Sequence, residues 1–229
     1  MGAFMPSNTF KFQDRTEAGY ILANRLRSYI KLRDVVVLAL PRGGVPVGAE
    51  IARALNVPLF TFIVRKLGVP GHEELAMGAI ASGTAPLINS TVIRRLHLSK
   101  ALVDTVVRRE TQALTRSERL YGRERQMPDV RDKIVILTDD GAATGSSLSL
   151  AVQTIRQQGA AQVIVALPVA SSHAVSQLNK TADQVVCLME PRRFMTVGHW
   201  YQEFDQMTDR EVFQILERVS VRVAGQKSA

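Results

Sequence analysis

The sequence predicts an α/β protein with a doubly wound, mainly parallel sheet and helices on both faces. Continuous runs of β-branched and other apolar residues, typical of strands buried on both sides, alternate with amphipathic segments of helical period. Such alternation indicates successive strand–helix–strand units. The chain has 229 residues, of which 46% are hydrophobic and 22% charged. This ordinary globular composition excludes disordered and repetitive classes and fits one domain over 1–229.

The first half of the chain begins with a helix and a buried strand. Apolar residues recur at helical spacing before the first strand-like run, and a glycine-rich turn precedes the next helix. The predicted elements are a helix over 14–31, a strand over 35–40, a helix over 45–55, a strand over 59–64, a turn-rich stretch over 66–74, two short paired strands at 76–82 and 85–88, and helices over 91–96 and 100–121.

The second half repeats the alternation and ends in a helix. After a polar connection, apolar runs again precede segments of helical period, and Gly159 ends the first of these helices. The predicted elements are strands over 133–138, 162–169 and 185–189, helices over 146–158 and 172–179, an irregular aromatic segment over 191–205, and a closing helix over 209–219 with Thr208 as its N-cap.

Charge and composition narrow the partners and the compartment. The net charge is +8 and the pI about 10.1, which suits an anionic partner. Basic residues gather between 94 and 133, but no aromatic residue interleaves them before Tyr121, so we favour a solvated face and expect no nucleic-acid partner. The apolar runs are too short to span a membrane, so we expect a cytoplasmic protein. The single cysteine, Cys187, lies in an apolar run and is interpreted as a buried structural thiol.

The strongest functional motif follows the strand over 133–138. Asp139 and Asp140 stand at its carboxyl end, and a loop of small residues then opens a helix. Two carboxylates suit ribose hydroxyls, or a magnesium ion shared with a ligand. Backbone amides, the helix N-terminus and nearby hydroxyls suit a phosphate. The sequence lacks the lysine of a P-loop and the glycine spacing of a dinucleotide site.

This segment resembles the PRPP-binding signature of type I phosphoribosyltransferases. The resemblance implies that Asp139 and Asp140 contact the ribose and a magnesium ion. It further implies that the ribose phosphate is held by Gly141, Ala142, Ala143, Thr144, Gly145, Ser146 and Ser147. The turn Pro41-Arg42-Gly43-Gly44 resembles the family's pyrophosphate loop, which assigns Arg42, Gly43 and Gly44 to PRPP binding.

A third stretch, 65–80, resembles a group of bacterial phosphoribosyltransferase-like proteins. It stands where the family carries a mobile loop over the active site, here about 66–76. Arg65 and Lys66 at its root are candidates for holding pyrophosphate. Glu73 and Glu74 either accept the proton of the acceptor base or belong to a solvated turn, and the sequence leaves both interpretations open.

The base-binding side carries weaker signals. The family caps the base with a hood, here about 189–205, in which Phe194, Trp200 and Tyr201 either stack on the base or pack the subdomain. Ala143 replaces the acidic residue of the hypoxanthine-guanine enzymes, and the lysine that those enzymes use after the next strand is missing. The Ala-Thr-Gly turn is more similar to the adenine-type loop.

The resemblance implies a magnesium-dependent transferase that moves phosphoribose from PRPP to a nitrogenous base and releases pyrophosphate. Its partners would be PRPP and a small-molecule base, and we expect a homo-oligomer. The alternative is a regulatory or RNA-binding module that keeps the PRPP site as a sensor without turnover.

Overall fold

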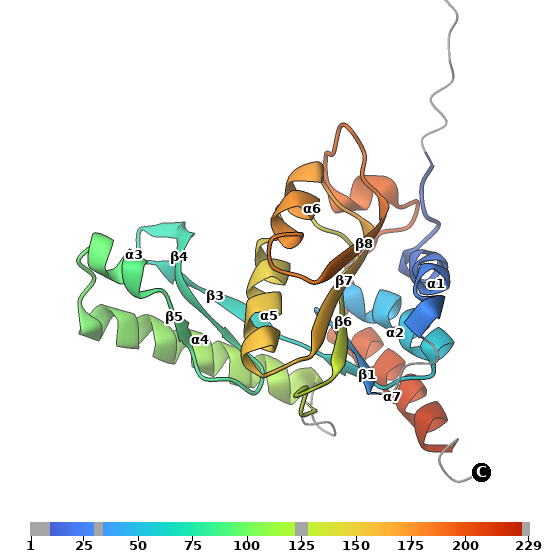
Figure 1. The fold of residues 1–229 in the computed structure, drawn as a ribbon, viewed down its shortest axis with the longest axis horizontal. Helices are drawn as coiled ribbons and strands as arrows, with labels where there is room; N and C mark the ends of the chain where they lie inside the picture. The colour runs from blue at the N-terminus through green and yellow to red at the C-terminus, as the bar shows by residue number, and fades with distance from the viewer. Residues whose placement is uncertain (1–9, 30–33, 122–127, 226–229) are drawn as a thin grey trace, which may run out of the picture.

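A five-stranded parallel sheet forms the centre of the molecule, as the sequence predicts. The computed structural model describes residues 10–29, 34–121 and 128–225 (Figure 1). All four strand pairs are parallel, in the order β2-β1-β6-β7-β8. The strands are β1 (Val35–Ala39), β2 (Leu59–Thr61), β6 (Ile134–Thr138), β7 (Gln162–Val169) and β8 (Gln184–Met189).

Helices cover both faces of this sheet and create two hydrophobic cores. One face packs against α1 (Arg15–Arg25), α2 (Gly44–Leu55) and α7 (Asp209–Gly225), and the other against α5 (Ser146–Gln157) and α6 (Ser172–Leu178). A short 3₁₀ turn, η1 (Arg27–Tyr29), follows α1, which ends earlier than the predicted 14–31. Among the residues that the structure describes, no helix combines the length and apolarity needed to cross a membrane.

An arm made of residues 64–121 extends away from the parallel sheet (Figure 1). Leu67 and Met77 on its sheet pack against Val106 on its long helix, which gives the arm a core of its own. It comprises the antiparallel strands β3 (Val64–Val69), β4 (His72–Ala81) and β5 (Leu87–Ile88) and the helices α3 (Ser90–Arg95) and α4 (Lys100–Tyr121).

The arm differs from the prediction at its beginning. The chain leaves the parallel sheet after Thr61, so the apolar run predicted as one strand over 59–64 is divided between β2 and β3. The stretch predicted as a loop over 66–74 is a β-hairpin, whose turn is formed by Pro70 and Gly71. The hairpin forms because Leu67, Val69 and Met77 supply one apolar face, which α4 covers.

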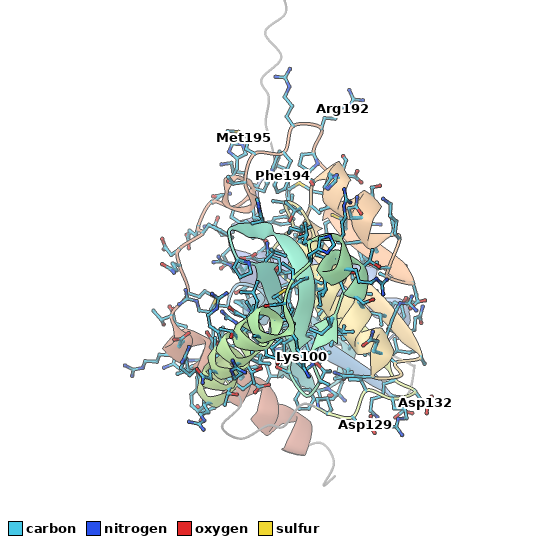
Figure 2. The ribbon with its side chains drawn as sticks, turned by 90° about the vertical axis from the view of Figure 1, so that its left-hand side faces the viewer. Lys100, Asp129, Asp132, Arg192, Phe194 and Met195 are labelled. Atoms are coloured by element: carbon cyan, nitrogen blue, oxygen red, sulfur yellow. The ribbon has the colours of Figure 1, made fainter. Side chains whose placement is uncertain are left out.

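The hood is irregular, as predicted, except for one short 3₁₀ helix. Beyond β8, this helix, η2 (Val197–Trp200), packs with Phe12 and Val169 in a small aromatic cluster. Figure 2 shows Arg192, Phe194 and Met195 at the outer end of the hood. The closing helix α7 begins after Thr208, whose hydroxyl accepts a hydrogen bond from the Glu211 amide, so the predicted N-cap is confirmed.

Candidate phosphoribosyl site

The topology places two loops together at one edge of the sheet. Strands β1 and β6 are neighbours, and the Leu40 amide donates a hydrogen bond to the Thr138 carbonyl at 2.9 Å. From β1 the chain turns to α2 on one face, and from β6 it turns to α5 on the other. Such a switch point opens a crevice at the carboxyl ends of the strands, where doubly wound proteins bind their ligands.

Glycines allow the two loops to touch. A Cβ atom on Gly43 would lie 2.0 Å from Asp140 Oδ2, and one on Gly44 would lie 2.8 Å from the Asp139 Cα. Gly43 has an ordinary φ of −61°. Glycine is therefore required at position 43 by space and not by backbone conformation. The loop predicted to bind pyrophosphate thus lies directly against the predicted ribose acids, and its Pro41–Arg42 peptide is cis.

Each carboxylate of the acidic pair has one bonded oxygen. The Asp140 amide donates to Asp139 Oδ1 at 2.9 Å, and Arg15 Nε donates to Asp140 Oδ2 at 2.8 Å. Asp139 Oδ2 and Asp140 Oδ1 have no hydrogen-bond partner in the described chain, where the only fully buried unpartnered side-chain polar atom is the Trp200 indole nitrogen. The two remaining oxygens can therefore accept hydrogen bonds from hydroxyl groups or bind a cation.

Burial raises the pKa of both carboxyl groups. The pKa of Asp139 is raised well above its ordinary value, first by burial and then by the neighbouring charge of Asp140. The pKa of Asp140 is also raised by burial, and the guanidinium of Arg15 opposes the rise. Two carboxylates held together in a poorly hydrated crevice favour a hydrogen-bond donor or a cation between them.

The loop after the acidic pair has the features of a phosphate site. Gly145 adopts a φ of +72° and begins α5 without any side-chain cap, which leaves the amides of Ser147 and Leu148 unbonded in the described structure. The hydroxyls of Thr144 and Ser146 lie 3.1 Å apart at the same end. Free amides at a helix N-terminus, with hydroxyls beside them, are the usual protein ligands of a phosphate.

Protein contacts fix the beginning of this loop. Ala142 is buried and its amide donates to the Val169 carbonyl, while the Ser171 hydroxyl donates to the Ala143 carbonyl at 2.6 Å. Gly141 has no room for a side chain, because a Cβ would lie 2.6 Å from a methyl group of Val197 in the hood. The loop over 141–147, which is predicted to hold the ribose phosphate and is called the cradle below, is therefore fixed at its beginning by Val169, Ser171 and Val197.

The predicted cations are less closely gathered. Arg42 Nη1 lies 3.9 Å from Asp209, and the Arg42 side chain is 37% exposed. Arg65 belongs to β3 and donates to Glu110 of α4 at 2.8 Å, so its charge is paired inside the arm. Lys66 also lies in β3. Of these predicted cations, only Arg42 is on a loop of the switch point.

Glu73 and Glu74 are not brought to the acidic pair of their own chain. Their backbone lies in β4 beside the hairpin turn, and their side chains are outside the described structure. Ala81 pairs with Val64 where the arm joins the body. Eight residues of strand separate Glu73 from Ala81, a length of roughly 26 Å. The structure thus differs from the expected loop that covers the site.

The hood aromatics correct one prediction. Trp200 and Tyr201 are only 7% and 3% exposed, because they pack in the cluster around Phe12. Neither ring presents a face to a base, so they fulfil the alternative interpretation, in which they pack the subdomain. Phe194 is half-buried at the edge of the same cluster. It is the one predicted base-stacking residue that the described structure leaves partly accessible.

Arg15 is the site residue that sequence reasoning missed. It is the first residue of α1, and its side chain is 11% exposed. The guanidinium bonds Asp140, donates to the Asp205 carbonyl at 3.0 Å, and lies 3.8 Å from the centre of the Phe204 ring. A cation at a helix N-terminus is unfavourable because it faces the positive end of the helix dipole. An arginine at the beginning of the predicted helix was therefore the sequence feature that could have indicated a special role for Arg15.

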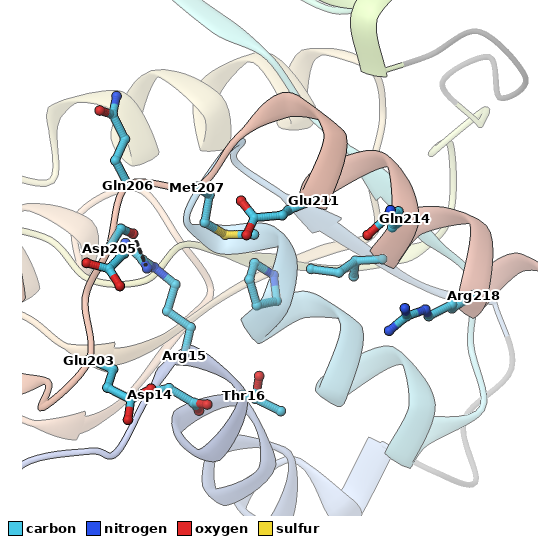
Figure 3. A pocket seen from close by; sticks show the side chains of 12 residues that line it. Asp14, Arg15, Thr16, Glu203, Asp205, Gln206, Met207, Glu211, Gln214 and Arg218 are labelled. Atoms are coloured by element: carbon cyan, nitrogen blue, oxygen red, sulfur yellow. Dashed lines mark hydrogen bonds between the residues drawn. The ribbon is translucent and has the colours of Figure 1, made fainter.

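A cleft lies beside Arg15, between the beginning of α1 and α7 (Figure 3). Its volume is about 340 Å³. The dashed line in Figure 3 marks the hydrogen bond from Arg15 to the Asp205 backbone. Arg15 therefore both lines this cleft and bonds the acidic pair through Asp140.

The acidic pair also fits a magnesium ion. Mg²⁺ prefers oxygen ligands and is usually held by one or two carboxylates together with substrate phosphates. Asp139 Oδ2 and Asp140 Oδ1 are two such oxygens in one crevice. Within the described ranges, no group of three or more His, Cys, Asp or Glu side chains forms a dedicated metal cage. A substrate would therefore have to supply part of the coordination.

The fold and the site define a class: a doubly wound α/β protein with an acidic pair, a helix N-terminus with free amides and a glycine turn at its switch point. Comparison with known proteins supports this classification. The profile of the phosphoribosyl transferase domain matches residues 71–202. The chain belongs to this family.

Two relatives and one solved structure are similar over most of the chain. "Putative phosphoribosyl transferase Rv0571c" and its counterpart MT0597, from two strains of Mycobacterium tuberculosis, are each 42% identical over 207 residues, which are 90% of this chain and 46% of theirs. The chain thus spans about half the length of these relatives. The crystal structure of TT1426 from Thermus thermophilus superposes with a TM-score of 0.83 at 38% identity, over 91% of this chain and 99% of that one.

Proposed function

We propose that this protein binds PRPP with Mg²⁺ at the switch point and transfers its phosphoribosyl group to a ring nitrogen of a small-molecule base. The observation that carries the proposal is a pair of oxygens, Asp139 Oδ2 and Asp140 Oδ1, that have no hydrogen-bond partner among the described residues and lie between the cradle and a glycine turn. Two acceptor oxygens match the two ribose hydroxyls. The cradle and the turn lie on either side of them, as the 5′-phosphate and the pyrophosphate would require.

The proposed reaction forms a bond from the acceptor nitrogen to the anomeric carbon. The bond from that carbon to the pyrophosphate oxygen breaks, its electrons leave with pyrophosphate, and the acceptor nitrogen loses a proton. Asp139 and Asp140 would orient the ribose, and Arg42 with the turn at Gly43 would meet the departing negative charge. Magnesium, when bound at the acidic pair, would neutralise charge on the phosphates.

The residue at position 143 of the cradle supports a second candidate function. Ala143 occupies the position where an acidic side chain could accept the proton, and the arm places Glu73 and Glu74 far along β4. A site with these residues can hold PRPP without an evident proton acceptor. This favours a PRPP-binding regulator without turnover as the alternative.

One experiment separates the two functions. Isothermal titration with PRPP and Mg²⁺ measures binding, and an assay of pyrophosphate release with a panel of purine and pyrimidine bases measures transfer. Binding with base-dependent release supports the transferase. Binding without release for any base supports the regulator, and failure to bind PRPP contradicts both.

A further inference from the structure

Arg15 belongs to a closed circuit of four residues around the acidic pair. Its Nε bonds the Asp140 carboxylate, and its guanidinium lies over Phe204 at 3.8 Å. Phe204 stacks on Tyr201 with ring centres 5.0 Å apart, and the Tyr201 hydroxyl donates to the Asp140 carbonyl at 2.6 Å. We call Arg15, Asp140, Tyr201 and Phe204 the Arg15 circuit. It joins the N-terminal helix and the hood to the same aspartate, at its side chain and its backbone.

The circuit determines which Asp140 oxygen faces the crevice. Oδ2 receives Arg15 and lies against Gly43, where a Cβ would come within 2.0 Å. Rotation of the carboxylate would break the bond to Arg15 and press the other oxygen against the glycine turn. Oδ1 therefore remains as the acceptor for a ligand. A planar guanidinium that bonds through Nε and a second nitrogen fixes direction better than an ammonium group.

We propose that Arg15 is a positioning residue of the phosphoribosyl site, which holds Asp140 and the hood so that Asp140 Oδ1 receives a ribose hydroxyl. This inference rests on the proposed function, since it concerns how PRPP is held. Arg15 itself contacts Asp140 and the hood. It acts through them on the ligand.

The chain offers a matched control for the loss of an arginine. Arg156 at the end of α5, like Arg15, bonds one backbone carbonyl and one carboxylate: its Nε donates to the Thr181 carbonyl and its Nη2 donates to Asp183, both at 2.7 Å. Asp183 precedes β8 at the amino-terminal edge of the sheet, opposite the crevice. Arg156→Gln therefore removes a similar set of bonds away from the site.

The test titrates PRPP with Mg²⁺ into wild-type protein and into Arg15→Gln, Arg15→Lys and Arg156→Gln, with thermal denaturation as the check of folding. A hydrogen bond to a charged group contributes enough that Arg15→Gln should weaken PRPP binding about 10–100-fold. Arg15→Lys keeps the charge without the planar geometry and should recover part of the affinity. Arg156→Gln should bind as wild type. A fourth variant, Arg15→Ala, leaves space for a free guanidinium ion, and millimolar guanidinium should restore its PRPP affinity.

Several results would overturn the inference. Wild-type affinity in folded Arg15→Gln, an equal loss in Arg156→Gln, or a loss that neither lysine nor guanidinium relieves would each show that Arg15 does not position Asp140. If Arg15→Gln does not fold, Tyr201→Phe tests the same circuit, because it removes only the bond to the Asp140 carbonyl, and unchanged PRPP affinity would then refute the proposal. A wild-type protein that fails to bind PRPP would instead refute the proposed function.

Discussion

Gly43→Ala is the sharpest test of how closely the glycine turn approaches the acidic pair. The new methyl group would lie 2.0 Å from Asp140 Oδ2 and 2.5 Å from its Cγ, whereas ordinary contact begins near 3.4 Å. The carboxylate or the turn must therefore move by at least 1 Å to reach even the tightest tolerated separation of 3.0 Å. Because a misplacement of about 1 Å at a site can cost about 10²-fold, we expect PRPP affinity to fall by roughly that factor.

The same substitution should lower stability modestly. Overpacking of this kind costs about 1–3 kcal/mol, which for a domain of this size lowers Tm by roughly 2–12 °C. The φ of −61° at Gly43 suits alanine, so the effect is steric alone. Isothermal titration with PRPP and Mg²⁺ measures the affinity, and circular dichroism measures Tm.

Gly71→Ala is the matched control. Gly71 stands at the arm's hairpin turn with a φ of +80°, and among the described residues no atom beyond its chain neighbours lies within 4 Å of a Cβ built there. Alanine is strained in that conformation by about 1–2 kcal/mol, so the Tm of Gly71→Ala should fall about as much as that of Gly43→Ala, while its PRPP affinity stays unchanged. A folded Gly43→Ala protein that binds PRPP as tightly as wild type would refute the packing argument.

Three further predictions concern other parts of the molecule. Gly145→Val should abolish PRPP binding, because a β-branched residue is strained at φ +72° and crowds the cradle. Titration measures the binding and circular dichroism checks the fold; a folded variant that still binds PRPP would show that this loop does not hold the phosphate. Glu73→Gln with Glu74→Gln should leave PRPP affinity and turnover unchanged, because the arm leads away from the acidic pair; a fall in turnover of about 10²–10⁴-fold would restore their role as proton acceptors. Burial raises the pKa of Cys187 from 9.0 to about 11. The thiol of the unfolded chain therefore ionises at lower pH than that of the folded chain, and the free energy of unfolding should fall as pH rises from about 9 to about 11. Cys187→Ala should lessen this fall in a urea-denaturation series, and an equal fall in both proteins would contradict the interpretation of Cys187 as a buried thiol.

The sheet and the phosphate cradle were predictable because their signals are local. The run from Ile134 to Thr138 is apolar on both faces, so it had to become an interior strand, and the acids after it had to lie at the carboxyl edge. Two successive strand-loop-helix units then brought Gly43 next to Asp140. Strand pattern and chain order were sufficient to place the acidic loop at this edge, whereas the resemblance to phosphoribosyltransferases was needed to assign Arg42, Gly43 and Gly44 to the site.

The contacts of Arg15 and the hood were not predictable in this way. Arg15 and Asp140 are 125 residues apart in the chain, and only tertiary packing unites them. Trp200 and Tyr201 have the composition of a stacking site, but Phe12, far upstream, covers them. The arm was missed because Gly68, Pro70 and Gly71 read as loop residues, whereas the apolar partner that makes the segment a hairpin, α4, begins nearly thirty residues later.

Above all, we infer that Asp139 Oδ2 and Asp140 Oδ1, which have no hydrogen-bond partner in the described part of the chain, receive the ribose of PRPP. Isothermal titration of PRPP with Mg²⁺ into wild-type protein and into Asp139→Asn with Asp140→Asn tests it most directly. The account predicts saturable binding to wild type and none to the folded double variant, because amides are poorer acceptors for the hydroxyls and for the metal. Equal binding to both proteins, or no binding to wild type, would contradict it.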